Sequence, residues 1–480
     1  MTKPKVSTFE RLRSKRLNRK ERKELQRKIE TDDPGLEIVH PHAAGIDIGN
    51  ESHFAAVGPG RSEQPVQEFG SWTEDLHRMA AWLKSCGVTT VAMQSTGVYW
   101  IAAEHVLQQA GLEVYLVNAR GTKNLPGRKT DVQECQWIRK LHTYGLLRNS
   151  FRPPEQIRAV RTVWRQRDRV VKEAGRTMQQ MQKALTTMNV QLANVISDLS
   201  GLTGMAILRR ILAGERDPWK LAKLRDRRIQ ASEEEIARSL EGNWQPDVLF
   251  ELEQVVEAYD LYQKQISDCD KQLQKYMAAL PDREAPGNQA ASTAAADTPA
   301  RKAKPRKKQK NQPAFDIEAE QRRTMGVDLR KVDGIDIVTT QTVLSELGPD
   351  LSAWRTEDHF TSWLQLAPRR DISGGKVIRQ PAQAVRNRVA NAFRNAAQAL
   401  SRSDSYLGAK YRYLHARLGG LKGTKAMARY LACLVYRMLT KGEAWVDRGS
   451  AYYENKRRER ELVAVRRKAA ALGMQVVPAC

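Results

Sequence analysis

The stretch AAGIDIGNESHFAAVG, residues 43–58, decides the fold of the first part of the chain. Two short apolar segments, AAGIDIG and HFAAVG, flank a polar turn, and this pattern predicts a β-hairpin. Asp47 lies between Ile46 and Ile48, and because side chains alternate along a strand, its carboxylate faces away from both isoleucines. A charged group inside a strand needs an ion-pair partner or a metal ion. Asp47 is therefore the first candidate functional residue.

The residues after this hairpin predict an α/β domain. The expected elements are a strand in VQEFGSW (66–72), a helix in TEDLHRMAAWLKSCG (73–87), a buried strand in TTVAMQS (89–95), a helix in VYWIAAEHVLQQAG (98–111) and a strand in LEVYLVNA (112–119). Three antiparallel strands followed by alternating helix and strand is the order of a ribonuclease H-like domain. We predict that fold for residues 41–150.

Positive charge dominates the composition. The 480 residues include 80 Lys and Arg against 55 Asp and Glu, which leaves a net charge of +25. A surplus of this size predicts a polyanionic partner, and nucleic acid first. The five cysteines form no CxxC pair, so neither a disulfide framework nor a structural zinc site is expected. No apolar run approaches the roughly 18 residues of a membrane span, so we expect a cytoplasmic protein without a membrane partner.

Composition also divides the rest of the chain. Residues 1–40 form a basic arm that orders on its partner, or alternatively a merely solvated helix. Residues 151–280 predict long polar helices, either a coiled-coil region that could pair subunits or a self-contained helical bundle. Residues 281–317 are a basic low-complexity linker. Residues 318–442 predict a mainly helical C-terminal domain, and residues 443–480 a basic tail.

Two further acids follow the predicted sheet. In GRKTDVQECQW (127–137), Asp131 and Glu134 lie three residues apart at an expected helix start, hence on one face, although this spacing is also common at helix N-termini. In a ribonuclease H-like fold, both acids would converge with Asp47 and with Gln94, which ends the fourth strand. Oxygen ligands of this kind bind Mg²⁺ or Mn²⁺. Gln94 would contribute a neutral amide oxygen, so metal affinity should be lower.

A serine loop lies far downstream, in LAPRRDISGGKVIRQ (366–380). Ser373 precedes two glycines, which let a phosphate approach the backbone, and cations surround it. The residues expected to contact nucleic acid there are Arg369, Arg370, Gly374, Gly375, Lys376 and Arg379. Ser373 is well placed to attack phosphorus. The alternative is a basic hairpin turn that only touches DNA, because Ser-Gly-Gly is a common turn.

A second segment, VDGIDIVTTQTVLSELG (332–348), resembles a hairpin between two short helices that presents backbone N–H groups to a phosphate strand. Gly334 and Thr339 are the residues expected to contact nucleic acid, with Thr340 and Thr342 nearby. A core helix with threonine caps has a similar sequence, so both interpretations stay open.

Taken together and in this order, GIDIGNESHFAAV, AMQSTGVYW, GRKTDVQECQW and SGGK resemble transposases of the insertion-sequence one-ten (IS110) family, specifically its eleven-eleven branch. The resemblance covers roughly residues 41–150 and 325–440. It implies a RuvC-like domain with a D-E-D-D metal tetrad and a C-terminal domain with a serine nucleophile. The tetrad positions fall on Asp47, Gln94, Asp131 and Glu134, and the nucleophile on Ser373. Gln94 and Glu134 depart from the commonest tetrad.

The resemblance also implies partners. A structured RNA encoded beside the gene would pair with double-stranded donor and target DNA, and the protein would act as a homo-oligomer, a dimer or tetramer, at the nucleoid of a prokaryotic cell. The leading hypothesis is thus an RNA-guided DNA transposase or recombinase. Two alternatives are a metal-only RuvC-like nuclease that resolves junctions and a nucleic-acid-binding protein whose catalysis has decayed through Gln94. Glu51 or Glu104 could supply the missing charge, although neither has the right strand position.

Overall fold

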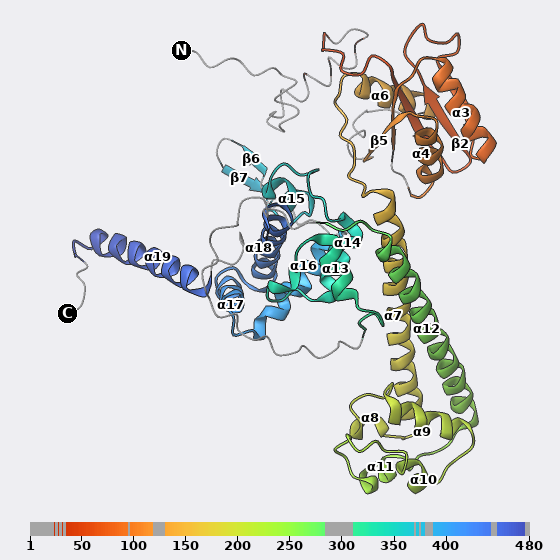
Figure 1. Cartoon of the computed structure of the whole chain (residues 1–480), viewed down its shortest axis with the longest axis vertical. Helices are drawn as coiled ribbons and strands as arrows, with labels where there is room; N and C mark the ends of the chain where they lie inside the picture. Colours follow the sequence, from red (N-terminus) through yellow and green to blue (C-terminus); the bar gives the residue numbers. More distant parts are fainter. Residues whose placement is uncertain are drawn as a thin grey trace. The chain divides into compact units, whose positions relative to one another are not determined.

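A computed structural model describes residues 35–94, 97–118, 130–283, 311–368, 371–373, 376–379, 387–442 and 449–475, together with Glu24, Arg27 and Thr31. The chain divides into two compact units, Met1–Arg152 and Pro153–Cys480 (Figure 1). The basic arm therefore lies almost entirely outside the described residues, as does most of the predicted linker. No described helix is both long and apolar enough to cross a membrane.

The first unit is built on a mixed five-stranded sheet. Its strands are β1 (Ala43–Ile48), β2 (Ser52–Ala56), β3 (Val66–Gly70), β4 (Thr90–Gln94) and β5 (Glu113–Val117). The spatial order is β3-β2-β1-β4-β5. The pairs β1–β2 and β2–β3 are antiparallel, whereas β4 pairs in parallel with β1 and β5. The predicted α/β order with three antiparallel strands first is confirmed.

Helices cover both faces of this sheet (Figure 1). The helices α3 (Thr73–Ser85) and α4 (Trp100–Gln109) pack on the face that carries Ile46 and Ile48, in one apolar cluster with β4 and β5. The helix α6 (Asp131–Thr143) packs on the other face, against residues of β4 and β5. Asp47 alternates with the two isoleucines, so it lies on the α6 face.

Gly45 allows α6 to lie directly on β1. A Cβ atom at Gly45 would lie 2.2 Å from the backbone nitrogen of Arg139 and 2.4 Å from the carbonyl oxygen of Cys135. Any side chain there would push the helix away from the sheet. The far end of α6 is fixed separately, because the buried His142 shares a hydrogen bond of 2.9 Å between its Nε2 and Thr90 Oγ1.

The second unit begins with two long helices, α7 (Glu155–Thr187) and α12 (Pro246–Ala278). They run antiparallel, because Arg167 of α7 meets Asp270 of α12 while Met181 and Leu185 share a cluster with Leu252 (Figure 1). Four short helices connect them: α8 (Leu192–Val195), α9 (Leu202–Leu212), α10 (Pro218–Ala222) and α11 (Glu233–Ser239). Both a long helix pair and a small helical core are therefore present.

A buried ion pair joins the two long helices. The side chains of Arg167 and Asp270 are 4% and 7% exposed, and the guanidinium donates to both carboxylate oxygens. Arg167 Nη1 also donates to the carbonyl of Asn311 at 3.0 Å, and Asp270 Oδ2 accepts from the amide of Ala314 at 3.1 Å. The pair thus attaches the segment that leads into the C-terminal helices.

The C-terminal part is mainly helical, as predicted. Its elements are α13 (Ile317–Met325), η1 (Leu329–Lys331), α14 (Ile337–Leu347), α15 (Glu357–Trp363), β6 (Asp371–Ser373), β7 (Lys376–Arg379), α16 (Arg388–Ala399), η2 (Leu400–Arg402), α17 (Tyr406–Leu418), α18 (Gly420–Lys441) and α19 (Gly449–Ala471). The large buried side chains Val343, Phe393 and Leu431 come from α14, α16 and α18. The helix α19 lies within the predicted basic tail.

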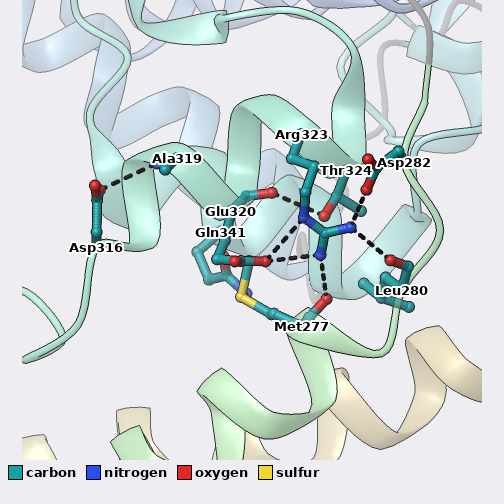
Figure 2. A network of polar contacts seen from close by, with 9 residues as sticks. All are labelled: Met277, Leu280, Asp282, Asp316, Ala319, Glu320, Arg323, Thr324 and Gln341. Carbon is teal, nitrogen blue, oxygen red and sulfur yellow. Dashed lines mark hydrogen bonds and ion pairs between the residues drawn. The ribbon is translucent and has the colours of Figure 1, made fainter.

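Arg323 connects α13 to the end of α12. Its guanidinium donates to the carbonyls of Met277 and Leu280 at 2.7 and 2.6 Å, and it pairs with Glu320 and Asp282 (Figure 2). These carbonyls belong to the last turn of α12 and the residues after it, where no intrahelical donor follows. A single cation therefore caps one helix and orients the next.

We predict that Gly45→Ala lowers the free energy of unfolding of the first unit by about 2 kcal/mol or more, because the new methyl group overpacks the α6 backbone. The control is Gly175→Ala in α7, where an added Cβ would meet no atom within 4 Å. That change should stabilise the helix by about 0.5–1 kcal/mol. Calorimetric unfolding of both variants tests the prediction, and equal melting temperatures would contradict it.

We predict that Asp270→Asn destabilises the second unit by about 3–5 kcal/mol, because it leaves a buried guanidinium without its counter-charge. The control is Glu173→Gln, which breaks an ion pair of 2.7 Å with Arg176, whose side chain is 70% exposed. Glu173→Gln should lower the free energy of unfolding by less than about 1 kcal/mol. Urea unfolding measures both, and a similar small effect for the two variants would show that Asp270 is dispensable.

Candidate functional site

Two of the predicted site residues end neighbouring parallel strands. The register pairs Ile46 of β1 with Met93 of β4, and Asp47 and Gln94 are the next residue along each strand. Asp47 is half-buried, whereas Gln94 is 4% exposed. Both therefore lie at the same edge of the sheet, at the carboxyl ends of the two strands.

The other two residues come from the first turn of α6. Thr130 caps this helix. Its hydroxyl oxygen accepts from the amide of Gln133, and the side-chain oxygen of Gln133 accepts from the amide of Thr130. Asp131 is the first helical residue and is exposed, and Glu134 follows one turn later, half-buried. Because α6 lies against β1 at Gly45, its first turn is carried toward the sheet edge that holds Asp47.

The thiol of Cys135 is near two of the acids, Asp47 and Asp131. Burial, and after it the negative charges of Asp47 and Asp131, raise the pKa of the Cys135 thiol to about 12. The two carboxylates thus act on the same buried sulfur from β1 and from α6. The Cys135 thiol donates to the carbonyl of Val132 at 3.1 Å. It serves as a packed apolar group rather than as a thiolate nucleophile or metal ligand.

Gln94 contacts Glu134 directly. The amide Nε2 of Gln94 donates a hydrogen bond to Oε1 of Glu134. A second carboxylate at position 94 would repel Glu134 across this short contact, whereas an amide binds it. Gln94 therefore holds the side chain of Glu134 in place at the edge of the sheet.

The donor set fits a hard divalent cation, since it consists of three carboxylates and an amide, all with oxygen ligands. In the part of the chain that the structure describes, however, no three His, Cys, Asp or Glu side chains lie close enough together to hold a metal ion. Gln94 also directs its nitrogen, not its oxygen, at Glu134. Joint binding of a cation would require the Gln94 amide to turn over. The metal ligands stay a prediction.

Neither neighbouring acid is positioned to replace the missing charge. Glu104 is 2% exposed and forms an ion pair with Arg152, whose guanidinium lies 4.6 Å from the centre of the Trp100 ring. Its charge is therefore already compensated. Glu51 is exposed in the turn between β1 and β2.

The serine loop forms part of a short hairpin in the second unit. In the antiparallel pair β6–β7, Ser373 pairs with Lys376, with two residues between them. For Ser373, Lys376 and Arg379 the structure describes the backbone alone, and Arg369, Arg370, Gly374 and Gly375 lie outside the described residues. The roles of these seven residues stay predictions.

The segment 332–348 packs into the core of the second unit. Gly334 has φ of +86°, and a Cβ there would lie 2.7 Å from the carbonyl oxygen of Ala396, so both its conformation and its packing require glycine. Thr339 is 6% exposed and its amide donates to Asp336 Oδ1 at 2.7 Å. Thr340 is 1% exposed. Nucleic-acid contact by Gly334 and Thr339 stays a prediction.

Comparison with known families agrees with this architecture. Residues 44–190 match a family model for the DEDD domain of IS110 elements, described as a transposase. Residues 328–412 match a second model, described as a transposase of the IS116/IS110/IS902 family. A search of curated proteins found no match.

Both matched models describe transposases, and this class of protein implies phosphoryl transfer on DNA. The chain belongs to the IS110 family, with a DEDD N-terminal domain and the C-terminal domain that the second model describes. The DEDD domain implies the use of a divalent metal ion. The four residues at the sheet edge have oxygen donors that suit such an ion, and their assignment as its ligands stays a prediction.

We predict that Gln94→Glu raises the affinity for Mg²⁺ and Mn²⁺ at least about tenfold, because a charged ligand replaces a neutral one. Without metal, the variant should be less stable near neutral pH, since two adjacent carboxylates repel. Its stability should recover as the pH falls, because that repulsion raises a carboxyl pKa in the folded state. Melting temperatures across metal concentration and pH measure both effects.

The control variant for this prediction is Gln64→Glu, which adds the same charge in an exposed loop. It should leave metal affinity unchanged. Equal effects of the two variants would mean that position 94 does not contribute to the metal site.

Proposed function

We propose that this transposase exchanges DNA strands with Ser373 as its nucleophile. The observation that carries the proposal is the β6–β7 pairing, in which Ser373 faces Lys376 across a two-residue Gly-Gly connection. Ser373 is the last residue of β6, and Lys376 is the first residue of β7. A serine at the end of a strand, with Arg369, Arg370 and Lys376 close to it in the sequence, is suited to meet a phosphodiester.

The proposed step conserves bonds. Ser373 Oγ forms an ester with the phosphorus, one bridging P–O bond of the strand breaks, and the serine proton ends on the departing hydroxyl. Attack by the hydroxyl of another strand reverses the step and releases the serine. The cations predicted to oppose the charge of the pentavalent phosphate are Arg369, Arg370 and Lys376.

The acidic site completes the proposal. We assign the ligands of the divalent ion to Asp47, Gln94, Asp131 and Glu134. When bound, such an ion neutralises phosphate charge and orients the DNA. The protein's own contribution is positional: the Thr130 cap holds the first turn of α6, and the Gln94 amide holds Glu134.

The target is proposed to be chosen by an RNA encoded beside the gene, which pairs with donor and target DNA. The net charge of +25 supports a large phosphate-binding surface for both nucleic acids. We also propose a dimer or tetramer in which the serine of one subunit meets the acidic site of another. Both proposals rest on the family resemblance.

We predict that Ser373→Ala abolishes excision of the element in cells that carry the gene with its native flanking DNA, measured as loss of the circular junction. DNA binding should persist, since only a hydroxyl is removed. The control is Ser362→Ala, an exposed serine of α15. It should leave the junction at the parental level.

The other outcomes separate the alternatives. A junction that survives Ser373→Ala but disappears with Asp47→Asn would assign the chemistry to the acidic site alone, as in a metal-only nuclease. No junction from the parent, with recovery on Gln94→Glu, would indicate catalysis that has decayed at position 94. Either result contradicts the serine mechanism in this chain.

A further inference from the structure

One face of α7 carries a continuous row of cations. We call it the α7 stripe, and its residues are Arg158, Arg161, Arg165, Arg169, Lys172, Arg176 and Lys183. Successive members are three, four or seven residues apart, so they lie one above another on a helix. Between Arg176 and Lys183, the positions that would continue the row are Gln179 and Gln180, so no acid interrupts it. The stripe is ~38 Å long at 1.5 Å per residue.

The stripe lies opposite the packed face of α7. The buried side chains of this helix include Val160, Trp164, Val170, Ala174 and Met181, which fall about half a turn away from the cations. The side chains of Lys172 and Arg176 are 66% and 70% exposed. The packing of α7 against α12 therefore leaves most of the stripe open to solvent.

The carboxylates beside the stripe do not balance it. Among the described residues, its ion pairs involve three acids: Glu346 with Arg165, Asp168 with Lys172, and Glu173 with Arg176. Asp168 also pairs with Arg388 of α16 at 2.9 Å, which adds a further cation. Seven cations of the stripe and Arg388 thus face three carboxylates, and the surplus is concentrated on one line.

Repulsion within the stripe is strongest near α14. Arg158 and Arg161 are half-buried, and Arg165 donates to both carboxylate oxygens of Glu346. Burial, and after it the positive charge of Arg165, lower the pKa of Arg161; Arg158 adds to this, and the carboxylate of Glu346 opposes it. Like charges held together in this way are stabilised by a bound anion.

The outward face of α12 is different. It mixes acids with cations at Glu253, Glu257, Lys264, Asp268 and Lys271. A mixed face suits water or another protein surface. A single-sign row without apolar side chains suits neither a coiled-coil seam nor a protein core, but it does suit a phosphate backbone.

We propose that the α7 stripe binds the phosphodiester backbone of duplex DNA, without reading its sequence. DNA is the occupant because the family acts on DNA. A duplex carries one charge per ~1.7 Å of its axis, and each base pair has two phosphates, so one base pair occupies ~3.4 Å. The ~38 Å length of the stripe therefore matches about eleven base pairs. The inference rests on the DNA substrate alone and is independent of the role of Ser373 and of the acidic site.

The test neutralises three exposed stripe cations in the full-length protein: Arg169→Gln, Lys172→Gln and Arg176→Gln. Their partners are neighbours on the same helix, so folding should be preserved. The control triple, Lys264→Gln, Lys271→Gln and Lys275→Gln, removes the same charge from exposed positions of α12. Fluorescence anisotropy with a 30-base-pair random DNA duplex, over a range of KCl concentrations, measures affinity and its salt dependence.

We expect the stripe triple to weaken DNA binding at least about tenfold at low salt. The slope of log K against log[KCl], which is negative, should also become less steep by about 2 to 3. Each phosphate contact contributes about 0.9 to its steepness, and the variant loses three cations. The control triple should change the slope by less than about 1. Equal slopes for the two triples would overturn the proposal and leave the stripe a solvated helix face.

Two further arms separate the other occupants. Loss of binding to a 30-base-pair RNA duplex, with DNA binding intact, would assign the stripe to RNA and overturn the DNA assignment. Sedimentation velocity of the protein alone tests self-association. A changed oligomeric state with unchanged DNA binding would assign the stripe to a protein contact. Excision after Ser373→Ala is a separate measurement, so failure of one proposal does not imply failure of the other.

Discussion

The direct contact between the backbones of α6 and β1 at Gly45 is the constraint on which the acidic site depends. A side chain larger than hydrogen cannot be placed there without moving Arg139 and Cys135. The contact sets the distance of α6 from the sheet, and the distance in turn brings Asp131 and Glu134 toward Asp47 and Gln94. Cys135, whose carbonyl oxygen makes this contact, is fully buried. Because Gly45 has no Cβ, the acids of α6 can approach a strand that lies far from them in the sequence.

If the divalent ion binds as we propose, Gln94 changes the balance between stability and metal binding at this edge. Four carboxylates in a small volume repel one another until a cation joins them, so a DEDD site is costly without metal. The hydrogen bond from Gln94 to Glu134 removes one such repulsion. On the proposed ligand assignment, the folded domain is more stable without metal than a four-carboxylate site would be, and it has less charge to attract the ion. The family's chemistry and this substitution are compatible if the remaining three acids bind tightly enough.

Much of the first unit could be predicted from its sequence. Short apolar segments, a polar turn and the acids Asp131 and Glu134 at a helix start are local signals, and they predicted the succession of strands and helices and the start of α6. Contacts between residues far apart in the chain leave no comparable local pattern in the sequence. The ion pair of Arg167 with Asp270 joins positions 103 residues apart, and the pattern of α7 alone indicated only a polar helix.

The C-terminal segments show the same limit. The threonines after Gly334 are equally suited by sequence to present a phosphate site or to pack in a core. The hydroxyl of Thr340 donates to the carbonyl of Asp336 at 2.8 Å, four residues back, which is a local bond that any buried helical threonine can make. The cations of the α7 stripe have helical spacing in the sequence, but only the buried face of α7 shows that they lie on its exposed side.

The attachments of Arg167, Asp270 and Arg323 have a consequence for the segment 284–310. Residue 283 is joined to α13 through its amide and the Arg323 carbonyl, and residue 311 is joined to α7 through Arg167. Both ends are therefore held near the last turns of α12, whatever lies between them. The entropy of closing such a loop grows only with the logarithm of its length, about 0.6 kcal/mol per doubling. A change in the length of this segment should therefore cost the fold little.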